Sequence, residues 1–120
     1  MCIRDRYIED IVELNDYQEQ ALNTDVYPDD KFNIGYKALG LCGEAGEVSD
    51  KIKKVFRDCD GKLDENKAHE IAKELGDVLW YLSTLAYKLG YNLSEIATMN
   101  IYKLRKRMEE NKIHGSGDNR

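Results

Sequence analysis

The chain has 120 residues, with 18 Lys or Arg against 23 Asp or Glu, so its formal net charge is −5. This length suits one domain with one core, and we treat residues 1–120 as a single domain. The acidic balance argues against a nucleic-acid binder, and no run approaches the roughly 20 apolar residues of a membrane span. Three cysteines without zinc-type spacing, and no apolar signal region, favour free thiols in a cytoplasmic protein.

The two ends of the chain fall outside any periodic pattern. Residues 1–6, Met-Cys-Ile-Arg-Asp-Arg, fit neither helix nor strand, and we expect them to be an assembly artefact rather than native sequence. Residues 113–120 form a short, polar segment that contains glycine, so we expect a flexible tail.

Two helices are predicted in the first half, where apolar residues recur at helical spacing. The first runs from Tyr7 to about Thr24, and Asn15 or Asp16 could cap a second start within it. A loop with one proline and paired aspartates follows at Asp25–Asp30, and the second helix covers about Lys31 to Phe56.

Two more helices are predicted in the second half, after a connector at Asp58–Lys62. The third carries an amphipathic stripe from about Asp64 to Leu89 and ends at Gly90, a typical residue just beyond a helix. The fourth opens at Asn92 with a capping-box-like start. The sequence therefore predicts an all-α bundle of four to five helices.

Two carboxylate pairs stand out in these helices. Glu44 and Glu47 lie on the second helix, and Glu74 and Asp77 on the third. Residues three apart are neighbours on one helix face, so each pair points in one direction. If the helices pack side by side, four carboxylates converge, and a hard divalent cation such as Mg²⁺ or Mn²⁺ would relieve their repulsion.

Lysines continue the first pair along the same face. Lys51 and Lys54 follow Glu47 at steps of four and three, and cations beside metal ligands suit a phosphate ester. An exposed face of ordinary Glu–Lys pairs would explain this row as well, but the second pair on a separate helix favours a site. The third helix carries a matching row beside its apolar stripe, which consists of Glu70, Glu74, Asp77 and Tyr81.

Other chemistries fit the sequence less well. Neither histidine has a Glu three residues before it, so a di-iron Glu-x-x-His site is not favoured. The remaining chemistry is metal-assisted attack of water on phosphorus.

Three glycines interrupt the second helix, at Gly40, Gly43 and Gly46. Each costs about 1 kcal/mol relative to Ala in a helix interior, so we expect another backbone to approach closely there. A glycine-rich phosphate-binding loop is the more specific alternative, but the sequence lacks the Gly-Lys-Ser/Thr ending and the preceding strand of such a loop.

The runs Leu39–Val48 and Lys73–Leu79 resemble the MazG-like nucleoside triphosphate pyrophosphohydrolases of the all-α NTP pyrophosphatase superfamily. The motif of that family is Glu-Glu-x-x-Glu, a spacer and then Glu-x-x-Asp. Gly43 occupies the position of the first Glu of this motif, and the four acids named above match its other acidic positions. The resemblance extends over roughly Asn15 to Arg120, where three further features resemble a compact phage- and bacteria-type branch. These are Tyr17-Gln18, Asn100-x-x-Lys103-Leu104 and the tail Gly115–Arg120.

The resemblance implies hydrolysis of a (d)NTP between its α- and β-phosphates to a nucleoside monophosphate and pyrophosphate. It implies that four carboxylates hold Mg²⁺, with Mn²⁺ as the alternative, and that one of them is the general base, without saying which. The implied metal ligands and catalytic residues are Glu44, Glu47, Glu74 and Asp77. Row geometry and the resemblance together make Lys51, Lys54 and Lys103 candidates for phosphate contacts, and Asn100 a candidate for nucleotide contact.

The family works as homodimers or as tetramers built from dimers, in which helices of two subunits complete the bundle. Tyr36, Trp80 and Tyr87 suit such an interface, although simple core packing explains them equally well. Two rivals stay open: a phosphoribosyl-ATP pyrophosphatase with the same acid layout, and a non-catalytic nucleotide-binding or helical interaction module.

Overall fold

The structure is a computed structural model that describes residues 10–110. Within this range it contains four α-helices and no strand, which confirms the predicted all-α class. The helices are α1 (Leu14–Asn23), α2 (Asn33–Cys59), α3 (Glu65–Lys88) and α4 (Leu93–Glu109). The expectations for residues 1–6 and 113–120 lie outside the described residues.

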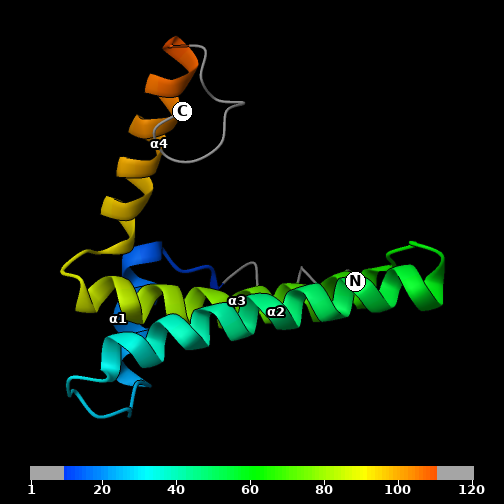
Figure 1. Cartoon of the computed structure of the whole chain (residues 1–120), viewed down its shortest axis with the longest axis horizontal. Helices are drawn as coiled ribbons and strands as arrows, with labels where there is room; N and C mark the ends of the chain where they lie inside the picture. The colour runs from blue at the N-terminus through cyan, green and yellow to red at the C-terminus, as the bar shows by residue number, and fades with distance from the viewer. Residues whose placement is uncertain (1–9, 111–120) are drawn as a thin grey trace.

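The long helices α2 and α3 form an antiparallel pair that runs the length of the molecule (Figure 1). Helix α1 crosses this pair at the end where α2 begins and α3 finishes, and it packs on α3. Helix α4 leaves from the same end and points steeply away from the pair, with contacts to α1 and α3. The far half of the α2–α3 pair is therefore covered by neither α1 nor α4.

Helix α1 begins at Leu14, and residues 11–13 just before it are not helical, so the predicted helix does not run unbroken through this stretch. Its first predicted residues, 7–9, lie outside the described residues. Neither Asn15 nor Asp16 caps a helix start, because both lie inside α1. The Asn15 side chain instead accepts a hydrogen bond from the backbone N–H of Ser94 at the start of α4, at 3.0 Å. Asn15 was a candidate cap for α1, but its side-chain oxygen accepts this hydrogen bond from α4 instead.

Side chains cap the starts of both α3 and α4, and the cap of α4 is the one that the sequence predicted. The Asp64 carboxylate accepts the backbone N–H of Lys67 at 2.8 Å and so caps α3. Asn92 and Glu95 form a complete capping box on α4, with reciprocal hydrogen bonds of 2.8 and 3.0 Å. Gly90 has a φ of 88°, which fits its predicted place just beyond α3.

The connector between α2 and α3 is shorter than predicted, because α2 continues through Asp58 to Cys59. The turn is made by Asp60 and Gly61, whose φ angles of 52° and 72° are left-handed. Gly61 is thus the turn residue that the sequence indicated.

Gln18 of α1 joins the end of the molecule where the helices meet. Its amide nitrogen donates to the carbonyls of Ser83 at 3.0 Å and Tyr91 at 3.1 Å, and its carbonyl oxygen accepts the N–H of Leu93 at 3.1 Å. One buried side chain therefore links α1, α3, the following turn and α4.

The apolar core within the described residues is small. The apolar stripe of α3 is only partly covered, since Leu75 is 53% and Leu89 is 56% exposed. No described helix is long and apolar enough to cross a membrane. The buried apolar residues are Ala21, Val55, Ile71, Ala86 and Leu93.

Candidate active site

Acids from both predicted carboxylate pairs meet between α2 and α3. Carboxylate oxygens of Glu44, Glu74 and Asp77 all lie within 4.8 Å of one another. Glu44 and Glu74 are half-buried, whereas Asp77 is exposed. Glu47 is exposed and lies outside this group. The structure therefore brings together three of the four predicted acids, from both helices.

The electrostatics of Glu44 show that these acids repel one another. Burial raises the pKa of Glu44, and the negative charges of Asp77, Glu74 and Glu47 raise it further. A raised carboxyl pKa means that the ionised form is disfavoured at this position. A bound cation would reverse that preference, because it favours ionised ligands. The charge of Glu47 is thus felt at Glu44, although its carboxylate stays outside the three-acid group.

The two predicted lysines of α2 differ in their relation to the acids. The Lys51 ammonium nitrogen lies 3.6 Å from a carboxylate oxygen of Glu74, so Lys51 borders the three-acid group. Lys54 lies one turn farther along α2, and its ammonium nitrogen pairs with Asp50 at 2.9 Å. The first lysine contacts the candidate site directly, and the second lies beyond it.

On the other side of the acids, Gly40 of α2 lies against Tyr81 of α3. A Cβ atom added at Gly40 would stand only 2.2 Å from a ring carbon of Tyr81, whereas Gly43 and Gly46 have no such neighbour within 4 Å. A close approach is thus confirmed at Gly40, but the neighbour is a side chain. The expectation of a close backbone at all three glycines is wrong.

Aromatic rings gather at this side of the acids. The Tyr81 ring lies 6.4 Å from that of Tyr36 and meets the Trp80 ring edge-on at 5.0 Å. The Tyr36 ring stacks on that of Tyr27 at 3.8 Å. Burial, the hydrogen bond with Tyr36 and the nearby charges of Glu44 and Asp77 raise the pKa of Tyr81. The ring cluster therefore adjoins the carboxylates.

A buried lysine packs against the ring cluster. Lys37 has a fully buried side chain, its ammonium nitrogen pairs with Asp25 at 2.7 Å, and it lies 4.5 Å from the Trp80 ring centroid. Its charge is therefore balanced inside this chain. Trp80 packs within one chain, whereas Tyr36 and Tyr87 remain 41% and 55% exposed.

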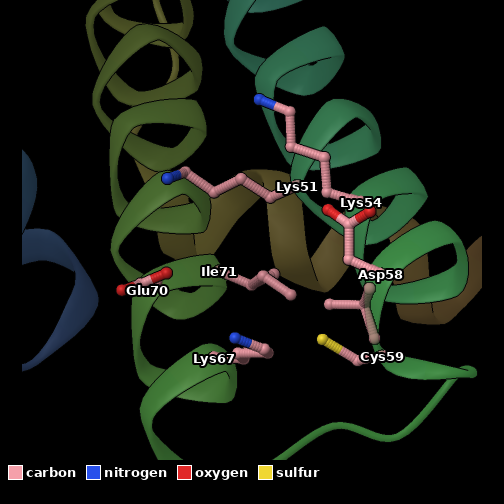
Figure 2. A pocket seen from close by; sticks show the side chains of 8 residues that line it. Lys51, Lys54, Asp58, Cys59, Lys67, Glu70 and Ile71 are labelled. Carbon is pink, nitrogen blue, oxygen red and sulfur yellow. The ribbon is translucent and has the colours of Figure 1, made fainter.

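A cleft with three lysines lies on the opposite side of the acids, between α2 and α3 (Figure 2). Its volume is about 230 Å³. Lys67 of α3 lines it, three residues before Glu70, and so extends the predicted row of α3 by one more step. Lys67 was not among the predicted site residues, and this spacing is the signal in the sequence that points to it. The lining residues are Lys51, Lys54, Val55, Asp58, Cys59, Lys67, Glu70 and Ile71.

Helix α1 also contributes a residue near the acids. Burial raises the pKa of the half-buried Tyr17, and the negative charge of Asp77 raises it further. Tyr17 therefore lies within electrostatic reach of the carboxylates. Tyr17-Gln18 is part of the family resemblance, but neither its position nor its spacing in the sequence predicted a role for Tyr17.

The two predicted nucleotide contacts on α4 do not reach the acids within one chain. Asn100 and Lys103 lie on the helix that points away from the α2–α3 pair (Figure 1). Helix α4 packs on α1 and α3 at the end of the molecule. The structure therefore separates these two residues from the three-acid group.

Comparisons with known proteins agree with this geometry. The model of the MazG nucleotide pyrophosphohydrolase domain matches residues 36–111, which span both acid pairs. The chain is also 41% identical over 109 residues to the Gene 37 protein of Mycobacterium phage L5, covering 87% of this chain and 96% of that protein. No solved structure matches the chain significantly.

An all-α chain that brings acids of two antiparallel helices to one point thus also carries the domain match. The chain belongs to the MazG nucleotide pyrophosphohydrolase family.

Proposed function

We propose that this protein hydrolyses nucleoside triphosphates to a nucleoside monophosphate and pyrophosphate in the presence of Mg²⁺, with Mn²⁺ as a substitute. The observation that carries the proposal is the convergence of Glu44, Glu74 and Asp77 within 4.8 Å, in a chain of the MazG family. Oxygen ligands of this kind suit hard divalent cations.

The residues present fit such a cation on chemical grounds. Three carboxylates share one position, and the pKa of Glu44 is raised first by burial and then by the negative charges of the neighbouring acids. In the proposal Glu44, Glu74 and Asp77 hold the cation, and Glu47, one turn along α2, completes the set. When bound, the cation supplies Lewis-acid stabilisation of negative charge on the phosphate oxygens and favours deprotonation of water.

The reaction balances without any further reagent. A water oxygen forms a bond to the α-phosphorus, and the bond from that phosphorus to the bridging oxygen of the β-phosphate breaks. Pyrophosphate leaves with the bridging oxygen and the electron pair, and a carboxylate of the site accepts the proton of water. Lys51, which lies 3.6 Å from Glu74, is placed to stabilise negative charge on the phosphates. Lys54 belongs to the same row of α2.

We propose that Asn100 and Lys103 act from a second copy of the chain, in a homodimer or homotetramer. The small core supports assembly, because two of the five buried apolar residues within residues 10–110 are alanines. Large apolar side chains stay exposed on α4 itself, including Met99 at 53% and Tyr102 at 75%. Surfaces of this kind mark interaction sites.

The test measures pyrophosphate release from standard and modified (d)NTPs with Mg²⁺, with Mn²⁺ and with a chelator. We expect metal-dependent release, reduced at least about 100-fold in Glu44→Gln, since this change removes a ligand carboxylate while keeping the shape. Glu47→Gln tests the fourth acid. Glu19→Gln, at an exposed position of α1, is the matched control and should retain full activity.

The rival functions predict different results in the same assay. Release from phosphoribosyl-ATP but from none of the free triphosphates would replace the proposal by the first rival. Nucleotide binding without release, with either metal and in folded protein, would favour the non-catalytic module.

A further inference from the structure

The lysine-lined cleft continues directly from the carboxylates along the α2–α3 pair. Lys51 belongs to both, because it lines the cleft (Figure 2) and its ammonium nitrogen lies 3.6 Å from Glu74. Lys54 stands on the α2 wall and Lys67 on the α3 wall. At about 230 Å³ the cleft has room for several waters, since one water takes up roughly 30 Å³. A chain of phosphate groups leaving the carboxylates would enter this space.

The charges that line the cleft leave one ammonium group, that of Lys67, to attract an anion, because Lys51 lies near Glu74 and Lys54 pairs with Asp50. Two carboxylates line it as well, but Asp58 already accepts two hydrogen bonds from Arg57, at 2.7 and 2.8 Å. The Arg57 hydrogen bonds, together with the charges of Lys54 and Lys67, lower the pKa of Asp58. Figure 2 shows the Glu70 carboxylate on the side of α3 away from α2. Neither carboxylate of the lining therefore cancels the charge of Lys67 by a direct ion pair.

Lys67 has the most available charge of the three lysines. Lys51 lies near Glu74 at 3.6 Å, and Lys54 pairs with Asp50 at 2.9 Å. Within residues 10–110, no carboxylate lies within ion-pair distance of the Lys67 ammonium group. Lys67 is also partly buried, which strengthens its attraction for a phosphate that enters the cleft.

The order of features along α2 gives the site a direction. At about 1.5 Å per residue, Glu44 lies roughly 6 Å along the axis from Gly40, and Lys51 roughly 10 Å beyond Glu44. Aromatic rings thus lie on one side of the acids and lysines on the other. These axial distances suit a nucleotide whose base and phosphates lie on opposite sides of the acids. Lys37 offers no cation at the aromatic side, because it is buried and paired with Asp25.

We propose that the cleft of Lys51, Lys54 and Lys67 binds the β- and γ-phosphates, the part released as pyrophosphate, with Lys67 as a substrate-binding residue. The inference rests on the proposed function, because it places the α-phosphate at the carboxylates. The base then lies at the opposite side, near the exposed Tyr36 ring, whose stacking on Tyr27 holds it in place. The reverse orientation would put three phosphates against rings and leave the lysines without an anion.

The experiment compares Lys67→Gln with Lys62→Gln, which removes the same charge from an exposed residue of the connector at the same end of the α2–α3 pair. Inorganic pyrophosphate and a nucleoside monophosphate are the two probes, and calorimetry measures their binding in the presence of Mg²⁺. Steady-state kinetics with a triphosphate gives KM and kcat. Lys67→Arg restores the charge, and thermal melts check that each variant is folded.

We expect Lys67→Gln to weaken pyrophosphate binding and raise KM about tenfold, as the loss of a charged hydrogen bond does. Binding of the monophosphate should not change, Lys67→Arg should recover most of the loss, and Lys62→Gln should resemble the wild type. If Lys67→Gln does not fold, the Lys67→Arg and Lys67→Met pair replaces it.

The outcomes separate this inference from the proposed function. Wild-type turnover with unchanged KM and pyrophosphate binding in Lys67→Gln would overturn the subsite and leave the function intact. Pyrophosphate binding that depends on Lys67, without any turnover by the wild type, would overturn the function and support the subsite. Equal losses for pyrophosphate and the monophosphate would overturn the assigned direction of the nucleotide.

Discussion

Gly40 shows how one residue positions a side chain of the candidate site. The Tyr81 ring occupies the space where any other residue at position 40 would carry its Cβ atom. Gly43 and Gly46 belong to the same run in the sequence, yet open space lies above both of them. The three glycines are equivalent by spacing but not by environment.

We predict that Gly40→Ala lowers the free energy of unfolding by about 2 kcal/mol, because the added methyl group overpacks against the Tyr81 ring. Gly43→Ala should raise the same quantity by about 0.5–1 kcal/mol, since Ala is the better helix former. Urea denaturation of both variants measures the difference. Equal effects of the two substitutions would show that Tyr81 moves aside at no cost.

Among the four described helices, α1 is the shortest, and a single residue attaches it to two others. Gln18 is 4% exposed and makes three hydrogen bonds to backbone groups of α3, of the turn at Tyr91 and of α4. Buried backbone groups without partners are costly, so this one amide holds the direction in which α4 leaves.

We predict that Gln18→Ala destabilises the protein by about 2–4 kcal/mol, because it leaves buried carbonyls and an N–H without partners. Gln20→Ala, at an exposed position of the same helix, should change stability by less than about 0.5 kcal/mol. Urea denaturation followed by circular dichroism measures both. A loss of similar size in the two variants would show that helix propensity, and not the hydrogen bonds, is responsible.

At the scale of the whole molecule, the far end of the α2–α3 pair carries an apolar groove of about 260 Å³. Phe56 is 69% and Leu63 is 56% exposed there. Neither α1 nor α4 covers this end (Figure 1). The proposed assembly with a second copy would remove these side chains from water.

We predict that the wild type sediments as a homodimer or homotetramer, and that Phe56→Asp weakens its association at least tenfold, because it places a charge in an apolar interface. Val26→Asp is the matched control, since Val26 is 93% exposed in the loop before α2. Sedimentation velocity over a range of concentrations measures the effect. A wild type that stays monomeric at every concentration would contradict the assembly.

Much of the fold was predictable because its signals are local. Periodicity located the helices, and Asn92 with Glu95 predicted the capping box that starts α4. The prediction was wrong at the start of α1, where Asn15 bonds to Ser94 instead of capping its own helix. That choice depends on a residue far away in the chain, which local spacing does not reveal.

The sequence by itself determined that each acid pair lies on one face of its helix, because the α-helix sets the direction of residues three apart. Only the tertiary structure decided that Glu44 meets Glu74 and Asp77 while Glu47 stays outside, since this depends on the register between α2 and α3. Register follows from side-chain packing between distant segments, as at Gly40. Packing between distant segments also decides that Lys67 lines the cleft and that α4 points away from the acids.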